Sequence, residues 1–420
     1  MDTEGIIDND TFTEHDPYEK PSFSLGIEEE YMLIDPETRE LKSHLQVELL
    51  SKGKAVLEEM VKPEMHGSMI EIGTPVCKNT NELHTQLRKI RSIVRHLAEN
   101  NGLKLGASST HPFSHWSTQE IYPDQRYYDM VEDMQLLARS LLIFGMHIHV
   151  GIESRETQIK IMNEMRYFLP HVLALSVSSP FWTGLQTGLK SYRSKIFERF
   201  PRTSIPDAFH SWSDYEAFTK LLVKTRCIDN PKRIWWDIRP HPNFPTLEVR
   251  ICDLPMTFEE SVSIAALIQA IAAKLFSLYR RNLSFRVYSR SLVLENKWRA
   301  VRYGLEGKMI DFGKQKEVPA RDLIRELLYF VDDVVDDLGS REHINRIYDI
   351  LDNGTGSQRQ LQVWEKSGED PKAVVDYIID QTQKNLLDDP KDFMPEVKKA
   401  SEEAIEERNE SHFDGTNTVI

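Results

Sequence analysis

The sequence predicts an α+β fold in which helices pack outside a curved, mainly antiparallel sheet with a polar concave face. Strand-like segments dominate the first two-thirds of the 420 residues, and helical periodicity dominates the last third. Segregation of this kind favours α+β over an alternating α/β architecture. Several strands also combine an apolar face with a face of carboxylate, imidazole or guanidinium groups, which indicates one shared polar surface.

The first of these strands, 23–34, carries Glu28 and Glu30. Because strand side chains alternate between faces, the two carboxylates share one face and Glu29 points to the other, where a structural role is expected. Two neighbouring carboxylates repel each other unless a cation lies between them, and Mg²⁺ prefers oxygen ligands. The pair therefore suggests a metal site. The alternative is an edge strand with a solvated acidic face.

Two later segments repeat the arrangement. Glu71 is the one charged residue of the apolar segment 67–76, and a lone buried carboxylate is costly unless it is paired or bound to a metal. His147 and His149 share one face of the strand 142–152. Both segments therefore bring potential metal ligands to the polar surface.

A fourth strand, 246–253, places Glu248, Arg250 and Cys252 on one face. The four strands could still be independent solvated faces. Their flanking residues are too apolar for free edges, however, which favours one sheet.

Composition excludes several classes of function. The formal net charge is −14, and broad nucleic-acid binding needs a basic surface instead. Three cysteines without CxxC spacing indicate a reducing compartment and no disulfide framework. Residues 1–20 are acidic and polar, unlike a signal peptide, and the uncharged run 261–273 is too short to cross a bilayer and reads as a buried core helix. We expect a cytoplasmic protein without a membrane partner.

The chain divides into a flexible acidic arm (1–20), a single domain (21–387) and an acidic C-terminal tail (388–420). A short strand is expected at 103–108. The stretch 180–245 is the least regular and reads as long functional loops or a surface insertion. The spacing of apolar residues predicts helices over 81–99, 131–139, 156–169 (ended by Pro170), 259–281, 320–338, 341–353, 371–387 and 394–409.

Nine short motifs occur in order between about residue 22 and about residue 385. They are Gly26-Ile27-Glu28-Glu29-Glu30, Ser68-Met69-Ile70-Glu71-Ile72-Gly73-Thr74-Pro75-Val76-Cys77, Met146-His147-Ile148-His149-Val150-Gly151, Ser179-Pro180-Phe181-Trp182, Ser191-Tyr192-Arg193-Ser194, Ile234-Trp235-Trp236-Asp237-Ile238-Arg239-Pro240, Thr246-Leu247-Glu248-Val249-Arg250, Glu295-Asn296-Lys297-Trp298-Arg299-Ala300 and Gly354-Thr355-Gly356-Ser357-Gln358-Arg359-Gln360. This set resembles the carboxylate–amine ligases of the glutamate–cysteine ligase type 2 family. One position departs from the pattern: many relatives have Pro-Arg-Thr-Gly-x-Pro where this chain has Ser204 in place of the glycine.

The resemblance implies a glutamine-synthetase-like catalytic domain, with the active site on the concave face of the sheet, that uses ATP and Mg²⁺ or Mn²⁺. It implies a bond between a carboxylate, typically the γ-carboxylate of glutamate, and an amine, typically that of cysteine. The metal-site positions that it implies are Glu28, Glu30, Glu71, His147 and Glu248.

Glu248 and Arg250 are the predicted catalytic residues, with Arg250 contacting phosphoryl oxygens; a plain Glu–Arg pair is the alternative. His149 could ligate the metal, contact substrate or pack in the sheet. Arg359 is expected in a glycine-bearing loop between helices, near phosphate. Other candidates for substrate or ATP binding, each of which could instead be a surface charge, are Arg193, Arg202 and Arg239.

The predicted function is an ATP-dependent glutamate–cysteine ligase that forms γ-glutamylcysteine through an acyl phosphate and releases ADP and phosphate. Its expected partners are small-molecule substrates and, in a homo-oligomer, further copies of the chain. Two alternatives remain open. A metal-dependent amidohydrolase can hold Zn²⁺ with His-x-His at the end of an early strand of a parallel barrel. A non-catalytic relative would keep the fold as a binding module.

Overall fold

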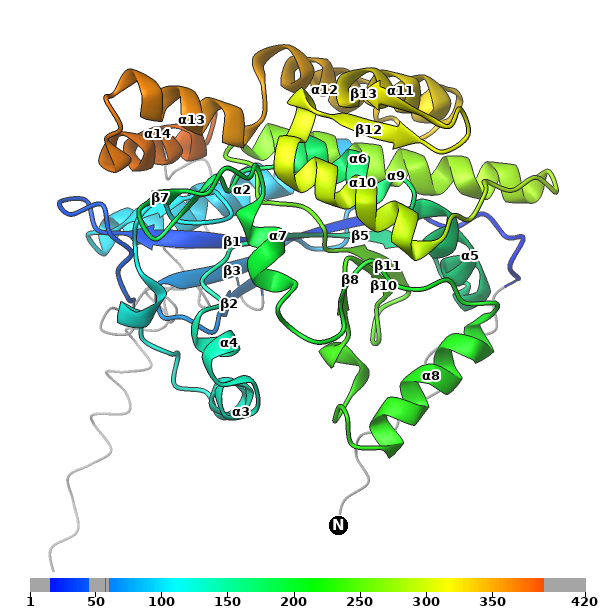
Figure 1. Ribbon diagram of the computed structural model, residues 1–420, viewed down its shortest axis with the longest axis horizontal. Coiled ribbons are helices and arrows are strands. Elements are labelled where there is room, and N and C mark those ends of the chain that lie inside the picture. The colour runs from blue at the N-terminus through cyan, green and yellow to red at the C-terminus, as the bar shows by residue number, and fades with distance from the viewer. Residues whose placement is uncertain (1–15, 45–56, 58–59, 389–420) are drawn as a thin grey trace, which may run out of the picture.

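The fold is built on one open sheet of seven strands (Figure 1). This computed structural model describes residues 16–44, 57 and 60–388. The strands follow the order β10-β11-β5-β1-β3-β2, with β4 also paired to β1, and every pairing in this sheet is antiparallel. Their bounds are β1 Leu25–Ile34, β2 Val61–Pro63, β3 Met69–Gly73, β4 Lys104–Gly106, β5 Met146–Gly151, β10 Ile238–Pro240 and β11 Thr246–Val249.

Helices cover one face of the sheet in layers, and the main hydrophobic core lies between the sheet and the first layer (Figure 1). Helices α3, α4 and α8 lie on the opposite side. The predicted α+β class with outer helices is confirmed. The helices are α2 Thr80–Asn100, α3 Gln125–Met134, α4 Leu136–Arg139, α5 Arg155–Met165, α6 Leu169–Ser176, α7 Tyr192–Phe197, α8 Trp212–Lys224, α9 Phe258–Arg280, α10 Arg290–Tyr303, α11 Ala320–Val335, α12 Arg341–Asn353, α13 Gly356–Lys366 and α14 Pro371–Gln383.

Three two-stranded ribbons complete the described structure. Two of them are antiparallel, β6 Phe181–Trp182 with β7 Leu185–Gln186 and β12 Lys308–Asp311 with β13 Lys316–Pro319. The third is parallel and joins β8 Thr203–Ser204 to β9 Trp235–Trp236.

Helix α9 is the centre of the helical layer and packs against α2, α5, α11 and α12. It begins at a capped N-terminus, where the Thr257 side chain accepts a hydrogen bond from the Glu260 N–H. Its length and composition would allow it to cross a bilayer, but 83% of its most apolar window is buried inside the protein. The prediction of a buried core helix is confirmed.

Strand β1 has two chemically different faces, as its alternation predicts. Leu25, Ile27 and Glu29 are buried on the helical side, whereas Glu28 and Glu30 are half-buried on the other. Its partners in the sheet continue the polar face. The pairing sets Glu28 opposite His147, Glu30 opposite Glu71, Gly26 opposite His149, His149 opposite Glu248 and Glu248 opposite Arg239.

Two predicted helix boundaries are wrong. Pro170 does not end a helix: α5 ends at Met165, and Pro170 lies in the first turn of α6, where a missing N–H and a fixed φ are tolerated. The predicted helix 131–139 is two helices, α3 and α4, because Gln135 adopts a φ of 51° between them.

The irregular stretch 180–245 contains the unpredicted helices α7 and α8. Helix α10 was also not predicted. The expected loop that carries Arg359 is helix α13, which Thr355 and Gln358 close with a reciprocal capping box. The predicted helix 394–409 lies outside the described residues.

Candidate active site

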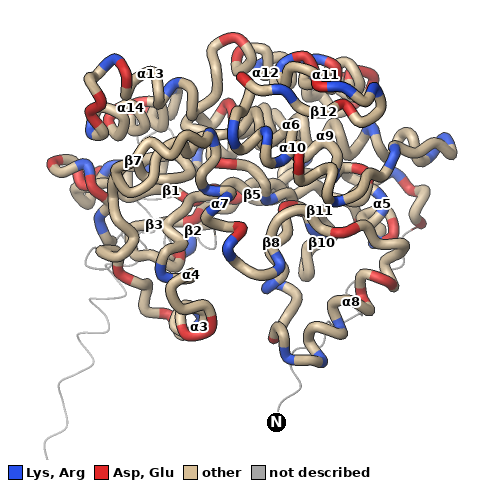
Figure 2. The backbone as a smooth tube through the Cα atoms, viewed as in Figure 1, with Lys and Arg blue, Asp and Glu red and all other residues tan. Residues whose placement is uncertain are grey.

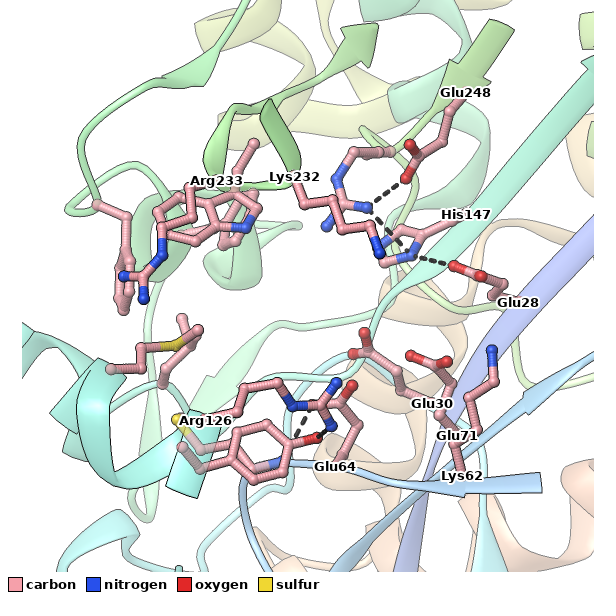
Figure 3. A pocket seen from close by; sticks show the side chains of 18 of the residues that line it. Glu28, Glu30, Lys62, Glu64, Glu71, Arg126, His147, Lys232, Arg233 and Glu248 are labelled. Atoms are coloured by element: carbon pink, nitrogen blue, oxygen red, sulfur yellow. Dashed lines mark hydrogen bonds and ion pairs between the residues drawn. The ribbon is translucent and has the colours of Figure 1, made fainter. Parts of the chain in front are cut away.

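A cavity of about 520 Å³ opens on the polar face of the sheet (Figure 3). Strands β1, β3, β5, β10 and β11 contribute its floor, and helix α7 and the segment 229–244 contribute its walls. Figure 2 shows acidic and basic segments near one another around β1, β2 and α7. Eight of the residues predicted from the sequence line it: Glu28, Glu30, Glu71, His147, Arg193, Arg239, Glu248 and Arg250.

One group of three carboxylates lies at the end of the cavity formed by β1, β2 and β3. Oxygen atoms of Glu30, Glu64 and Glu71 all lie within 4.8 Å of one another. Burial raises the pKa of Glu71 well above its usual value, and the charges of Glu28 and Glu64 raise it further. Burial likewise raises the pKa of Glu30, which accepts a hydrogen bond from the Gly145 N–H at 2.6 Å. Mutually repelling oxygen donors of this kind fit a hard divalent cation.

A second group combines carboxylates with an imidazole. Ligand atoms of Glu28, His149 and Glu248 lie within 4.8 Å of one another. His149 Nδ1 lies 3.1 Å from Thr246 Oγ1, which leaves Nε2 buried, without a hydrogen-bond partner and 3.9 Å from Glu28 Oε2. Burial alone would lower the pKa of His149, but Glu28 and Glu248 raise it above its usual value. An imidazole whose Nδ1 is held by a partner and whose Nε2 faces carboxylates is a typical metal ligand, so this group also fits a cation.

His147 lies beside Glu28, a member of the second ligand group. Its Nδ1 lies 3.1 Å from Glu28 Oε2 and 3.5 Å from an Arg250 Nη1, and it belongs to neither ligand group. Burial lowers the pKa of His147, and the neighbouring Arg250 charge lowers it further. Burial by itself raises the pKa of Glu28, but the hydrogen bond with His147 and the proximity of the His149 imidazole outweigh it and leave that pKa well below its usual value.

Glu248 lies between two guanidinium groups. Its Oε2 accepts a hydrogen bond from Arg239 Nε at 2.7 Å, and its Oε1 contacts Arg250 Nη1. Burial alone raises the pKa of Glu248, yet the two arginines hold that pKa well below its usual value. Arg239 also donates to the backbone carbonyls of Lys232 and Ile234, so it is anchored as a structural element.

Arg250 is less constrained than Arg239. It follows the last residue of β11, and its Nε is buried without a hydrogen-bond partner. The side chain therefore lines the cavity and retains one donor that no described protein group accepts. Cys252, predicted to share this face, instead lies in the main hydrophobic core because the strand ends at Val249 and the alternation ends with it.

Arg193 approaches the cavity from α7. It is buried, and its Nη2 donates to the Arg250 carbonyl at 3.2 Å, while its Nε has no hydrogen-bond partner. Arg193 therefore lies against the strand that carries Arg250 and keeps a polar atom for a ligand.

Two predicted binding residues do not reach this cavity. Arg359 Nη2 lies 2.7 Å from Glu260 Oε1 and joins α13 to the start of α9. Arg202 donates from Nε to the Arg233 carbonyl at 3.0 Å and lines a separate cavity. The packing of α13 on α9 sets the position of Arg359, and the contact with the Arg233 carbonyl sets that of Arg202. A local motif predicts neither contact.

Several residues that line the cavity lie outside any motif of the sequence. Glu64 directly follows the three-residue strand β2, which is too short to show alternation. Basic side chains surround the acidic floor. They come from segments without a strand pattern, so their positive charge is the one sequence feature that could have indicated a role in this cavity. Figure 3 places these cations around the cavity: Lys62, Arg126, Lys232 and Arg233.

Comparisons with known proteins agree with this architecture. The model of a family described as "Glutamate-cysteine ligase family 2" matches residues 24–377. A protein of Solibacter usitatus named "Putative glutamate--cysteine ligase 2" is 59% identical over 368 residues, covering 88% of this chain and 95% of its own. A protein of the same name from Herpetosiphon aurantiacus is 54% identical over 364 residues, covering 87% of this chain and 94% of its own.

Solved structures share the fold at low sequence identity. A glutamate–cysteine ligase of Francisella tularensis, crystallised with AMP, superposes with a TM-score of 0.64 at 12% identity and covers 96% of both chains. A bifunctional glutathione synthetase of Pasteurella multocida has a TM-score of 0.62 at 13% identity, covering 86% of this chain and 53% of its own. With a family match across most of its length and relatives above half identity, the chain belongs to glutamate–cysteine ligase family 2, a family of carboxylate–amine ligases.

Proposed function

We propose that the protein is an ATP-dependent glutamate–cysteine ligase. The observation that carries the proposal is that one cavity is lined by carboxylates of both groups of potential metal ligands, by the cation Arg250 and by a surrounding set of basic side chains. Oxygen-rich ligands and cations in one cavity are what a nucleotide triphosphate with divalent cations requires. Family membership supports the same chemistry.

The reaction has two steps. A carboxylate oxygen of glutamate attacks the γ-phosphorus of ATP, and ADP leaves. The amine of cysteine then attacks the acyl carbon, phosphate leaves, and a proton is lost from the amine. Glu30, Glu64 and Glu71 would hold one Mg²⁺ or Mn²⁺, and a second would lie at the other group, Glu28, His149 and Glu248. When bound, the cations supply charge neutralisation for the phosphates.

The chain's own residues supply orientation and positive charge. We assign Arg250 to the oxygens of the transferring phosphoryl group, because its side chain lines the cavity and contacts Glu248 of one ligand group. We assign Arg193 to a carboxylate of the substrate, because its own free Nε lies against the same strand end. Arg239 acts through Glu248 by holding that carboxylate in place.

The fold argues against the amidohydrolase alternative. That class places His-x-His in a parallel barrel, whereas His147 and His149 lie in an open antiparallel sheet. The nearby ligand atoms are mostly carboxylate oxygens, which favour hard cations over Zn²⁺.

The test is a screen of amino-acid pairs for ADP release with Mg²⁺ and ATP, with the peptide product identified by mass spectrometry. We expect the highest turnover with glutamate and cysteine, and none in excess chelator. Glu71→Gln should be inactive, while Glu37→Gln, which changes an exposed carboxylate after β1, should match the wild type. Turnover with a different pair would reject the substrate assignment. ATP binding without turnover of any pair would reject the enzyme in favour of the binding module.

A further inference from the structure

A second cavity of about 480 Å³ shares Phe200, in the segment that follows α7, with the candidate active site. Four cations and one carboxylate, Glu198, line it. We call it the Lys297 cavity. Its cations come from α7, the 202–204 segment and α10, and they are Lys195, Arg202, Arg290 and Lys297.

Two of the four cations are already neutralised. Lys297 Nζ lies 2.6 Å from Asp237 Oδ2 and 2.9 Å from Glu198 Oε1, and Lys195 Nζ lies 2.6 Å from Glu198 Oε2. Burial alone would lower the pKa of Lys297, but the two carboxylates raise it above its usual value. Lys297 therefore stays charged, and the two ion-paired lysines form one wall of the cavity.

The two arginines have no ion-pair partner within the described part of the chain. Arg202 donates from Nε to the Arg233 carbonyl at 3.0 Å, and Arg290 donates from Nε to the Ile205 carbonyl at 2.5 Å. Each thus keeps its terminal guanidinium nitrogens for another acceptor. Arg290 also lies near a second positive charge, that of the fully buried Arg166. Burial lowers the pKa of Arg166 and the charge of Arg290 lowers it further, while the charge of Asp207 opposes both effects.

The backbone beside these arginines is strained. Ser204 has a φ of 71° and Arg202 a φ of 58°, in the left-handed region that favours glycine. The Ser204 hydroxyl lies 3.0 Å from Lys297 Nζ on the cavity wall. A strained residue that adds a polar group to a cavity is typical of ligand-binding segments.

We propose that the Lys297 cavity binds a phosphate group, with Arg202 and Arg290 as its ligands. A planar guanidinium group binds two oxygens of a phosphate, and two unpaired arginines beside a charged lysine wall match a dianion. The volume exceeds that of a bare phosphate, and the ring of Trp298, 42% exposed at the rim, offers a surface for a larger organic group. The source is therefore either free orthophosphate or a nucleotide.

The cavity is connected to the candidate active site. Lys297 binds Asp237, and the Asp237 carbonyl accepts the Arg250 N–H at 2.8 Å. A bound phosphate would compete with Asp237 and Glu198 for Lys297.

The test is calorimetric titration of the full-length protein with orthophosphate and, separately, with ADP, in EDTA and at constant ionic strength. EDTA suppresses metal-dependent binding in the active-site cavity. We expect Arg202→Gln and Arg290→Gln each to weaken binding by about tenfold, because each loses a charge-assisted pair. Arg321→Gln is the matched control, a half-buried arginine at the start of α11 as Arg290 is at the start of α10, and it should bind like the wild type.

Lys62→Gln, at the active-site cavity, should also leave this binding unchanged. If both ligands depend equally on the two arginines and ADP binds more tightly than orthophosphate, the phosphate comes from a nucleotide. If ADP binds no more tightly than orthophosphate, the ligand is orthophosphate. Binding that is lost in Lys62→Gln but kept in both arginine variants would overturn the proposal. So would the absence of any binding to the wild type at about 10 mM, a concentration that a weak site of about 1 mM affinity would saturate. Melting temperatures of the variants check folding, and either arginine variant suffices if the other unfolds.

Discussion

Glu29 and Arg91 form an ion pair that is completely buried behind the candidate active site, with Arg91 Nη2 2.7 Å from Glu29 Oε2. Glu29 comes from β1 and Arg91 from α2, and Ser261 of α9 donates its hydroxyl to the same carboxylate at 2.5 Å. The ion pair therefore joins α2, and the Ser261 hydrogen bond joins α9, to the strand whose opposite face carries Glu28 and Glu30. The predicted structural role of Glu29 agrees with these contacts.

The first prediction concerns this pair. Arg91→Met should lower the free energy of unfolding by about 3–5 kcal/mol, because it leaves the Glu29 carboxylate buried without its partner. The double variant Glu29→Gln with Arg91→Met should recover much of the loss, since no unpaired charge remains. Urea denaturation measures both. A single variant as stable as the wild type would show that the pair does not hold the strand.

The second prediction compares two carboxylates of the cavity without metal. Burial and neighbouring carboxylates raise the pKa of Glu71, so its ionised form is disfavoured, and Glu71→Gln should raise the free energy of unfolding at neutral pH by about 1 kcal/mol. Glu248→Gln should lower it by about 2–4 kcal/mol, because Arg239 and Arg250 lose their shared partner.

Both variants should lose ligation, so activity alone does not distinguish them. Thermal unfolding in EDTA does. A fall in stability for Glu71→Gln would mean that its carboxylate has a stabilising partner, against the repulsive group described here.

The third prediction concerns Arg250. Arg250→Lys keeps the charge but loses the planar group that grips two oxygens, so kcat should fall by about tenfold to a hundredfold while KM changes little. Arg199→Lys, an exposed arginine just beyond α7, is the control and should leave both constants unchanged. Normal kcat with a raised KM for glutamate alone would instead make Arg250 a substrate-binding residue.

The fourth prediction is a pH dependence of stability. His111 is buried; its Nδ1 accepts hydrogen bonds from the N–H groups of Phe113 and Ser114, and burial lowers its pKa from 6.5 to about 3. Between these two values the unfolded chain binds a proton that the folded protein does not. Stability must therefore fall as pH falls below 6.5, with a slope of about 1.4 kcal/mol per pH unit from this one group.

His111→Asn retains an acceptor for the two N–H groups but does not titrate. Between pH 6 and pH 4 its free energy of unfolding should fall less steeply than that of the wild type, with a slope smaller by about 1.4 kcal/mol per pH unit. Chemical denaturation across this range gives both slopes. Parallel slopes would mean that His111 takes up a proton in the folded protein.

Local periodicity was sufficient for much of the architecture. The period-two alternation of β1 correctly separated Glu29 from Glu28 and Glu30, because a strand has only two faces. The apolar stripe of α2 and the uncharged run of α9 correctly predicted helices that bury those residues.

The same reasoning failed where a residue's role depends on distant neighbours. Glu64 joins Glu30 and Glu71 only because the very short β2 pairs with β3. His149 joins Glu28 and Glu248 because Thr246 lies beside its Nδ1 and leaves Nε2 facing the carboxylates. The local spacing of residues predicts neither of these two contacts.

The sequence by itself determined the α+β class, the polar face of the sheet and the residues that this face presents, because these depend on chain-local alternation and on burial of apolar side chains. Only the tertiary structure decided which cations reach that face. Arg250 ends beside Glu248 in the cavity, whereas Arg359 pairs with Glu260 and Arg202 lines the Lys297 cavity. The physical reason is that a long, flexible side chain takes the position that helix packing and its nearest partner allow, and those partners are far away in the sequence.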